Sequence, residues 1–544
     1  MFAGSSQLPM KLKHYASLFL INLIVLLGIA SLQPVPGYMD AEYYYAGAIR
    51  LYEGYGFTEE MLWNYLDDPS GLPHPSHTYW MPLVSILGVV GMKIAGAGSY
   101  LAARLIPFII ALWLPLVVTA WSIRIHPDPK LAYLSGLLAI FSAFYLPYLT
   151  HTDSFGLVMA FGLLFFIFIQ QIEKRKQEIW IVFFSLGLGF VSGLMHLSRA
   201  DGILWLLVSL IYLIWHSREQ VNEATSHLVG KTLAAAIFGY LMVMGPWFWR
   251  NYQLFGSLLA PGNFQALWLT TYNELYRYPA DSLSMQHWLA SGWANILTER
   301  LKALASNLQT MLAVQGEVFL FPFILLGLWF LRREKFIQLA VILWALLLII
   351  MTVIFPFAGA RGGFFHSAAA LQPVFWLVAP IGLDRTLDWV ARKRNWNREQ
   401  AGRVFQPALV GLALLLSLLV ILGNPSHQRA GLGDWGSTHS EYVQVEQALQ
   451  ETGADPRDIV MVNNPPGYYL AARRPAVSIP FGDVEIVLDV ARRYQVKYLL
   501  LEFNQLQGEE NIYENPHSST QLKYLVKIGH VQIYEFFPDK VETP

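Results

Sequence analysis

A succession of apolar stretches, each able to cross a lipid bilayer, constrains the fold of this chain more than any other feature. A helical span needs about 20 mostly apolar residues. The qualifying stretches, the shorter ones by extending into their flanks, are 18–32, 101–120, 131–148, 154–170, 179–197, 203–214, 232–249, 318–331, 336–355, 364–381 and 407–422. Only 14% of the residues are charged, whereas soluble domains carry about 25%. The sequence therefore predicts an all-α polytopic membrane protein with about eleven transmembrane helices.

Basic residues between these stretches indicate the orientation of the chain. Lysines and arginines gather in the loops at 124–130, 174–176, 218–231, 332–335 and 385–403. Because cytoplasmic loops are enriched in these residues, we expect the loops and the N-terminus to lie in the cytoplasm. The first stretch is followed by a poor cleavage site, so we expect it to remain as a helix. The loops 34–100 and 251–317 are then predicted on the outer side of a cell membrane.

One further apolar segment, 80–98, decides the predicted topology. If it crossed the membrane, every later basic loop would lie outside, against the charge rule. The segment is rich in glycine, contains Pro82 and Lys93, and follows two more prolines. We therefore predict a juxtamembrane or re-entrant helix that enters and leaves on the outer side, where irregular backbone is tolerated beside protein or a cavity.

The chain changes character after residue 430, where polar and charged residues return. Helical patterns occupy 441–451 and 484–494, strand patterns occupy 459–462, 476–479 and 497–503, and 524–536 resembles a hairpin. Alternating strands and helices are typical of a small α/β domain. The sequence thus predicts a transmembrane domain over 1–430 and an extracytoplasmic α/β domain over 431–544. Within it, residues 463–469 are predicted to form a structural turn, and the alternative is an acceptor-facing loop.

Composition excludes several classes of function. The net charge of −1 gives no electrostatic basis for binding nucleic acid. The chain has no cysteine, so neither a disulfide framework nor a thiolate nucleophile is available. The partners expected from composition are therefore the bilayer and molecules within it.

Three carboxylates stand where the predicted spans meet the outer surface. Asp40 and Glu42 follow the first span, and Asp153 precedes another. A carboxylate beside low-dielectric lipid binds its proton more tightly unless it is paired, and can then act as a general base. The alternative is that Asp40 and Asp153 are helix N-caps, with Glu42 adding first-turn stabilisation of the helix dipole.

Several cationic and polar side chains stand at the same boundary. They are Arg199 with Asp201, Arg250 with Asn251, and Arg361 with His366. An arginine at this level can hold a phosphate by two parallel hydrogen bonds. The alternatives are an Arg199–Asp201 pair that stabilises its turn, an Arg250 that snorkels from an aromatic belt, and a structural His366. We expect these groups and the carboxylates to meet in one pocket that suits an anionic lipid headgroup.

The order of these motifs resembles the GT-C superfamily of polyprenyl-phosphate-sugar-dependent glycosyltransferases. The likeness is greatest to the branch with protein O-mannosyltransferases and lipid A aminoarabinose transferases. It covers roughly residues 15–385 and depends on motif order and spacing. The residues that carry it are Asp40 and Tyr44, Gly54 to Phe57, His74-Pro75, Ala103-Arg104-Leu105, Thr152-Asp153, Ser198 to Gly202, and Pro246 to Asn251.

The resemblance implies an inverting sugar transfer from a polyprenyl-phosphate donor to a protein, lipid or glycan acceptor. The family's outer-loop aspartate deprotonates the acceptor, and this role maps onto Asp40, with Glu42 and Asp153 as further acidic candidates. One departure is Ala41, which stands where many members have a second acid, so Glu42 matches the pattern less well than Asp40. The residues expected to hold the donor phosphate are Arg104, Arg199, Arg250, Arg361 and His366. Those expected to line substrate loops are Tyr44, His74, Asp201 and Asn251.

The resemblance implies no cofactor, although Asp40 and Asp153 together are able to bind a divalent ion. Two other classes of function were weighed against the transferase. A transporter or lipid flippase would place ionisable groups near the bilayer midplane and often contains inverted repeats. A structural subunit would not explain the set of arginines and carboxylates. Another lipid-linked transferase, such as an oligosaccharide ligase, is a further alternative.

Overall fold

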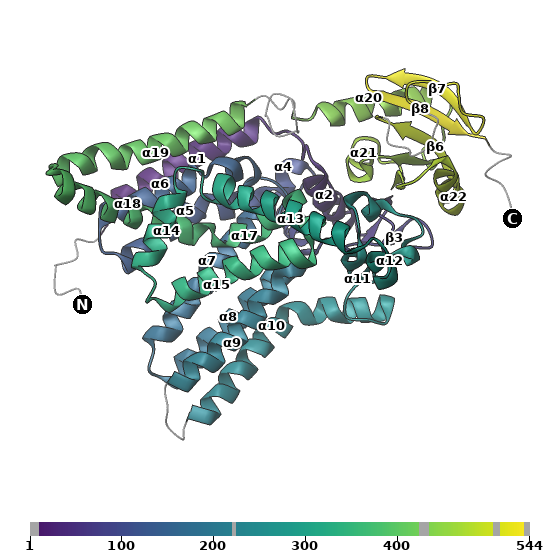
Figure 1. The fold of residues 1–544 in the computed structure, drawn as a ribbon. Helices are drawn as coiled ribbons and strands as arrows, with labels where there is room; N and C mark the ends of the chain where they lie inside the picture. Colours follow the sequence, from purple (N-terminus) through teal and green to yellow (C-terminus); the bar gives the residue numbers. More distant parts are fainter. Residues whose placement is uncertain (1–9, 220–224, 424–434, 504–511, 538–544) are drawn as a thin grey trace. The chain divides into compact units, whose positions relative to one another are not determined.

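The computed structural model describes residues 10–219, 225–423, 435–503 and 512–537 (Figure 1). The chain divides into two compact units, and each is described by itself. The helical unit comprises Met1–Leu32, Ile106–Trp247 and Leu301–Gly433. The mixed unit comprises Gln33–Leu105, Phe248–Arg300 and Asp434–Pro544.

Nine runs of helix in the described residues are long and apolar enough to cross a membrane. Their main helices are α1 (Leu12–Ser31), α5 (Leu105–Ile125), α7 (Phe155–Lys174), α8 (Glu178–Ser198), α9 (Ile203–Glu219), α10 (Thr225–Phe255), α15 (Lys335–Ile349), α18 (Gln372–Arg394) and α19 (Arg398–Leu422). Each coincides with a predicted span, and the prediction of a polytopic helical membrane protein is confirmed. The run Pro356–Arg394 is broken at Gly362, whose φ of 112° takes it out of the helix.

The other two predicted spans form shorter helices. They are α6 (Pro129–Ile140), which is followed by the 3-10 turn η1 (Ala143–Tyr148), and α14 (Phe321–Phe330). Residues with left-handed backbone lie just outside both helices: Ala143, with φ of 44°, follows α6, and Val318, with φ of 55°, precedes α14. The apolar segment at 80–98 forms α3 (Leu83–Ala95) in the mixed unit. Thirteen residues rise about 20 Å, which is less than the hydrocarbon core of a bilayer, so α3 is too short to span.

Glycines allow the helices of the helical unit to approach closely. A Cβ atom on Gly327 of α14 would lie 2.1 Å from the carbonyl oxygen of Val378, and one on Gly382 of α18 would lie 2.0 Å from that of Phe323. Helices α8 and α10 make a similar contact at Gly189. Membrane helices associate through such small residues because lipid offers no hydrophobic driving force between them.

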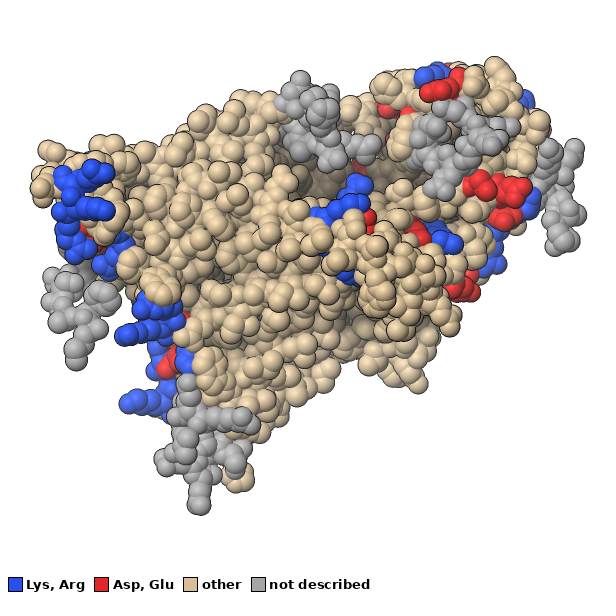
Figure 2. All heavy atoms as spheres, viewed as in Figure 1, with Lys and Arg blue, Asp and Glu red and all other residues tan. Residues whose placement is uncertain are grey.

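Basic side chains gather at one end of the helical unit. Figure 2 shows blue lysine and arginine spheres where α18 turns into α19, beside a long tan surface without visible charge. The last turn of α18 supplies Arg392, Lys393 and Arg394. This separation of charge from apolar surface is the pattern expected of a membrane protein with one basic side.

The mixed unit contains a six-stranded sheet with the order β2-β5-β4-β6-β8-β7. The strands are β2 (Met61–Leu62), β4 (Ile459–Val462), β5 (Ala476–Ser478), β6 (Val496–Leu501), β7 (Leu522–Ile528) and β8 (Val531–Phe536), and the helices beside them are α20 (Ser437–Glu451), α21 (Pro465–Ala472) and α22 (Val484–Tyr494). Strands β2, β5, β4 and β6 are parallel, whereas β8 is antiparallel to β6 and β7. The predicted strands and helices of the C-terminal segment are thus present. The turn predicted at 463–469 is wrong, because these residues begin helix α21.

The rest of the mixed unit comes from the two long loops. The first loop contains α2 (Met39–Tyr52), α3, α4 (Tyr100–Ala103), and the small sheet of β1 (Thr58–Glu59) with β3 (His74–Pro75). The second contains α11 (Gly262–Gln265), α12 (Met285–Ala290) and the start of α13 (Trp293–Gln309). Helix α2 packs against α3, where Gly88 lies so close that an added Cβ would be 2.8 Å from Ala48.

Candidate functional site

Asp40 lies in the first turn of α2, in the mixed unit. The N-cap of this helix is Tyr38, which makes no side-chain capping hydrogen bond, so the expectation of Asp40 as N-cap is wrong. The Asp40 side chain is half-buried. The nearby Tyr276 has its pKa raised chiefly by burial and also by the negative charge of Asp40. The charge of Asp40 therefore acts on a buried phenol of the same unit.

Glu42, two residues further along α2, has a different environment. Its side chain is only 4% exposed, and its Oε2 accepts a hydrogen bond of 2.7 Å from Nδ2 of Asn464 at the start of α21. Glu42 therefore contacts the C-terminal segment within the mixed unit.

Arg104 is the predicted phosphate ligand with the most distinctive surroundings. It follows α4 and is 3% exposed. Its Nη1 donates to the carbonyl of Gln33 at 2.7 Å, and its guanidinium stands 5.5 Å from the ring centre of Tyr100. Its Nη2 has no hydrogen-bond partner among the described residues. A buried guanidinium with an unused donor is suited to bind an anion.

Arg250 and Asn251 hold loops of the mixed unit together. Nη2 of Arg250 donates to the carbonyls of Phe57 at 3.3 Å and Ser76 at 2.9 Å, and its Nη1 donates to Asn251 at 3.0 Å. Asn251 in turn donates to the carbonyl of Leu258. These contacts tie the end of α10 to the first loop, and they occupy donors that the sequence analysis assigned to the donor phosphate.

The two remaining predicted residues of the first loop are buried. Tyr44 lies in α2, and its carbonyl accepts from Ser85 at 2.8 Å. Nε2 of His74 lies 3.2 Å from Oε1 of Glu59, and its Nδ1 lies 4.0 Å from Oδ2 of Asp67. Burial raises the pKa of Glu59 and lowers the pKa of His74, so both neutral forms are favoured. His74 is thus part of a buried polar cluster.

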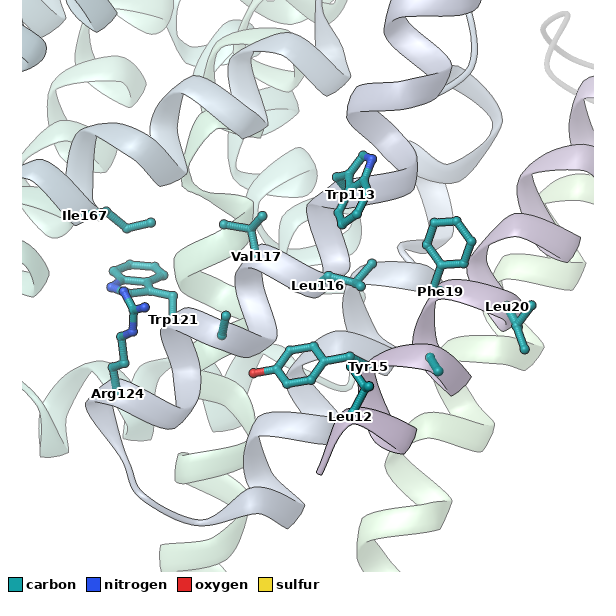
Figure 3. A pocket seen from close by; sticks show the side chains of 12 residues that line it. Leu12, Tyr15, Phe19, Leu20, Trp113, Leu116, Val117, Trp121, Arg124 and Ile167 are labelled. Atoms are coloured by element: carbon teal, nitrogen blue, oxygen red, sulfur yellow. The ribbon is translucent and has the colours of Figure 1, made fainter. Parts of the chain in front are cut away.

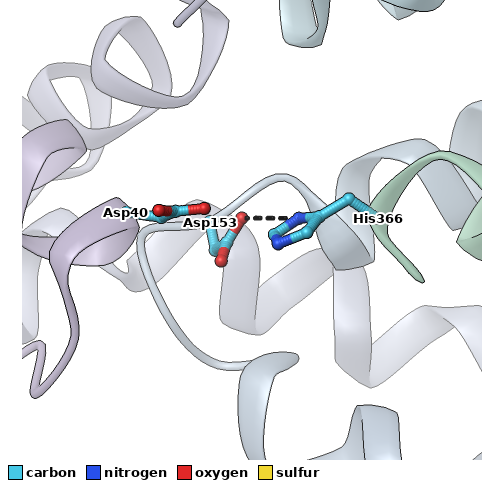
Figure 4. A group of neighbouring side chains, drawn as sticks. All are labelled: Asp40, Asp153 and His366. Carbon is cyan, nitrogen blue, oxygen red and sulfur yellow. Dashed lines mark ion pairs between the residues drawn. The ribbon is translucent and has the colours of Figure 1, made fainter. Parts of the chain in front are cut away.

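In the helical unit, Asp153 and His366 face each other (Figure 4). Nδ1 of His366 lies 3.6 Å from Oδ1 of Asp153, whose side chain is 1% exposed. The same Oδ1 accepts from the backbone N–H of Ser154, which is itself the N-cap of α7. The expectation that Asp153 is the N-cap is therefore wrong by one residue. The ring of His366 stacks on Phe155 at 3.9 Å between centres, which fixes its orientation.

Arg199 and Asp201 form a second polar group beside His366. Nε of Arg199 donates to Asp201 at 3.0 Å, so the predicted pair is present. Nη2 of Arg199 also donates to Oγ of Ser367 at 3.2 Å, and this hydroxyl donates to the other carboxylate oxygen of Asp201. Because Ser367 follows His366, these contacts bring the turn between α8 and α9 to the histidine.

Arg361 occupies the break in the run Pro356–Arg394. Its φ of −99° and ψ of 22° are not helical, and Gly362 follows with positive φ. The side chain is exposed. Arg361 therefore combines a non-helical backbone with an exposed side chain.

Sequence reasoning missed three groups. Ser367 links Arg199 to Asp201, and Asn464 holds Glu42, but neither residue type is distinctive in a sequence. Glu317 is fully buried in the helical unit, beside the indole of Trp376. A carboxylate beside a predicted span was the signal available for Glu317.

The structure thus assembles the predicted residues within each unit. Asp153, Arg199, Asp201 and His366 form one cluster in the helical unit, and Asp40, Glu42, Arg104 and Arg250 belong to the mixed unit. The expectation that all of them share one pocket joins residues of both units and stays a prediction.

Comparison with known proteins identifies the fold. A family model described as dolichyl-phosphate-mannose-protein mannosyltransferase matches residues 74–243. ArnT from Cupriavidus metallidurans, in a structure bound to undecaprenyl phosphate, is similar over 98% of this chain and 100% of its own, with 12% identity and a TM-score of 0.59. The Archaeoglobus fulgidus oligosaccharyltransferase is similar over 88% of this chain and 67% of its own, with 15% identity and a TM-score of 0.54. No curated protein matches the sequence.

These likenesses confirm the architecture that the motif resemblance predicted. The chain is an integral membrane protein with the fold of the GT-C glycosyltransferases.

Proposed function

We propose that this chain, which has the GT-C fold, is a membrane glycosyltransferase that moves a sugar from a polyprenyl-phosphate donor to an acceptor on the outer side of the membrane. The similar ArnT structure is bound to undecaprenyl phosphate, which is a lipid of this chemical class. The family model that matches residues 74–243 is named for a dolichyl-phosphate-mannose-dependent enzyme. Both support a donor whose sugar is attached to a lipid phosphate.

The observation that carries this proposal is the buried guanidinium of Arg104. No ion pair joins it to an acid in the described part of the chain, and its Nη2 is without a partner. Burying a cation without a counter-charge is costly. A lipid phosphate that binds there satisfies the charge and the free donor together, so we assign Arg104 to the donor phosphate.

Asp40 is assigned as the general base. In the proposed step its carboxylate takes the proton of the acceptor hydroxyl or amine, and the acceptor atom attacks the anomeric carbon of the donor sugar. The new bond to the acceptor forms as the bond from the anomeric carbon to the phosphate oxygen breaks, so the configuration inverts. The lipid phosphate leaves with the bonding electrons. The displacement is balanced without a metal ion or another cofactor.

The cluster of the helical unit is assigned an electrostatic role. Arg199 and Arg361 offer positive charge to the negative charge that develops on the leaving phosphate as the bond breaks. Oriented charges of this kind stabilise a transition state. In the proposed site His366 carries protons on both ring nitrogens, one toward Asp153 at 3.6 Å and the other toward the phosphate. The two acids thus have different assigned roles: Asp40 acts on the acceptor, and Asp153 pairs with the histidine.

The test is transfer of radiolabelled sugar from polyprenyl-phosphate donors by the purified full-length protein. We expect Asp40→Asn to lower kcat by about 100- to 10,000-fold, because the amide cannot accept the proton. Asp281→Asn changes an exposed acid of the same unit and should leave transfer unchanged. Full transfer by Asp40→Asn would exclude Asp40 as the base.

Arg104 is tested with the same assay. We expect Arg104→Gln to raise the KM for the donor by about tenfold or more, because a charged hydrogen bond to the phosphate is lost. Arg104→Lys keeps the charge and should retain part of the affinity. A KM that is unchanged in both variants would remove Arg104 from the donor site.

A further inference from the structure

The C-terminal segment contacts helix α2 at three places within the mixed unit. The first is the turn before the helix, where Nε1 of Trp435 donates to the carbonyl of Val35 at 2.8 Å. The indole packs under Gly37, where an added Cβ would lie 2.6 Å from it, and edge-on to Tyr38 at 6.0 Å. Any side chain at Gly37 would displace the indole, so the entry to α2 is shaped by Trp435.

The second contact lies in the first turns of α2. Glu42 accepts from Nδ2 of Asn464 at 2.7 Å, while Oδ1 of the same amide accepts from the backbone N–H of Gly467 at 3.2 Å and so caps α21. A Cβ on Gly467 would lie 2.9 Å from Oε2 of Glu42, so α21 lies closer to Glu42 than a residue with a side chain at position 467 would allow. The amide thereby joins the two helices, and both side chains are buried.

The third contact lies at the other end of α2. Arg473 pairs with Glu53 at 3.0 Å, an exposed pair that contributes little by itself. Beyond the helix, β2 adds as a parallel strand to β5, with Met61 opposite Ala476. Both ends and the first turns of α2 are therefore held by the segment that follows residue 434.

We propose that the C-terminal domain positions Asp40 through these contacts, and that Glu42, bonded to Asn464, is a positioning residue and not a second base. The proposal rests on the function proposed above for Asp40. Asp40 lies half a helical turn from Glu42, so a shift of α2 at Asn464 displaces both carboxylates. A misplacement of about 1 Å in a reacting group can lower a rate about 100-fold.

The polarity of the Glu42–Asn464 hydrogen bond allows a specific test. Glu42→Gln keeps a carbonyl that accepts from Asn464, so transfer should stay within about threefold of wild type, and the melting temperature should change little. Asn464→Asp places a second carboxylate against Glu42, so kcat should fall between about 10- and 100-fold with the donor KM unchanged. The double variant Glu42→Gln, Asn464→Asp reverses donor and acceptor and should restore kcat and the melting temperature.

The outcomes separate positioning from chemistry. If Glu42→Gln abolishes transfer and the double variant does not recover it, Glu42 acts in the reaction and the positioning role is overturned. If the double variant recovers the melting temperature that Asn464→Asp loses but no variant changes kcat, the contact is only structural and the positioning role is also overturned. If wild-type protein transfers no sugar from any donor, the proposed function itself fails, whereas loss of activity in Asp40→Asn alone supports it.

A separate observation concerns an apolar groove of about 780 Å³ in the helical unit, between α1 and α5 (Figure 3). Its walls include Phe19, Leu20, Trp113 and Leu116. Its polar groups are the phenol of Tyr15, the guanidinium of Arg124 and the indole nitrogens of Trp113 and Trp121, and Figure 3 shows the phenol oxygen on the side where the guanidinium lies. The groove thus combines an apolar channel with one cationic end.

Basic side chains stand on both of the helices that line the groove. Arg124 forms no ion pair with an acid in the ranges that the structure describes, and the exposed Lys11 and Lys13 begin α1. We infer that the groove holds one acyl chain of an anionic phospholipid, whose phosphate is bound by Arg124 and Tyr15. Basic residues at the membrane surface attract anionic lipids, and the apolar walls add the burial of the chain.

Native mass spectrometry of the detergent-purified protein tests this inference. With dioleoylphosphatidylglycerol and dioleoylphosphatidylcholine as probes, we expect selective retention of the former and about tenfold weaker retention in Arg124→Gln. Arg175→Gln, a basic residue outside the groove, is the matched control and should retain the lipid. Equal retention of both lipids, equal losses in the two variants, or displacement by undecaprenyl phosphate at equal concentration would each overturn the inference.

Discussion

His77 is a buried residue whose ionisation affects the stability of the mixed unit. It is buried, with hydroxyls of Ser76 and Ser85 at 2.8 and 2.9 Å from its ring nitrogens. Burial, together with the charge of Arg250, lowers its pKa to about 3. An unfolded histidine titrates near pH 6.5, so between these values the unfolded state binds the extra proton. Stability is therefore full above pH 6.5 and is lost as the pH falls, by about 2 kcal/mol at pH 5.

We expect His77→Gln to remove this acid sensitivity, because glutamine does not titrate. Thermal midpoints measured at pH 7.5 and 5.0 give the comparison, and the wild type should lose a few degrees more than the variant. A constant loss of packing in the variant cancels in this difference. His517→Gln changes an exposed histidine and should behave as wild type. Equal acid shifts in wild type and His77→Gln would contradict the assignment.

At the same scale, sequence reasoning identified residues by type and by position at span ends. Residue type and position were enough to single out Asp153, His366, Arg199 and Asp201, which the fold brings into one cluster. They did not suffice for Glu42, whose partner is 422 positions away. An amide at that separation carries no local pattern, so the partner of Glu42 is visible only in the folded chain.

Among the elements, α14 and α18 depend on two glycines for their contact. A Cβ on Gly382 would lie 2.0 Å from the backbone oxygen of Phe323, and neither backbone can move without moving its helix. We expect Gly382→Ala to destabilise the helical unit by about 1–3 kcal/mol, the usual cost of overpacking. The measurement is the thermal midpoint of the purified protein in detergent.

The matched control for this prediction is Gly411→Ala on α19, where no atom lies within 4 Å of the added Cβ. Alanine there should be neutral or stabilise by up to about 1 kcal/mol, because it favours the helix. If the two variants melt alike, close packing of α14 on α18 is not a determinant of stability.

The elements also show where sequence patterns suffice. Apolar length predicted the long helices, and short strand-like runs predicted the strands that follow residue 458. Helix α21 was missed because Pro465 and Pro466 resemble a turn, although proline fits the first turn of a helix. Strand β2 was missed because two residues carry no pattern, and its partner β5 lies in the distant C-terminal segment.

For the whole molecule, the proposed function requires each loop to lie on a defined side of the membrane. The proposed function needs the loops 34–100 and 251–317 and the C-terminal domain on the outer side. The basic last turn of α18 and the basic loop at 174–176 should then face the cytoplasm, since lysine and arginine resist translocation. The chain has no cysteine, so single cysteines report on this arrangement without a background.

The orientation is tested with Asp281→Cys, Ser518→Cys and Lys176→Cys, all at exposed positions. In intact cells a membrane-impermeant maleimide should label the first two variants and not the third. Lys176→Cys should become labelled once the membrane is permeabilised, which excludes burial as the cause of its protection. Labelling of Lys176→Cys in intact cells, with protection of Asp281→Cys, would invert the topology. It would place Asp40 on the cytoplasmic side, where a donor delivered to the outer leaflet is out of reach.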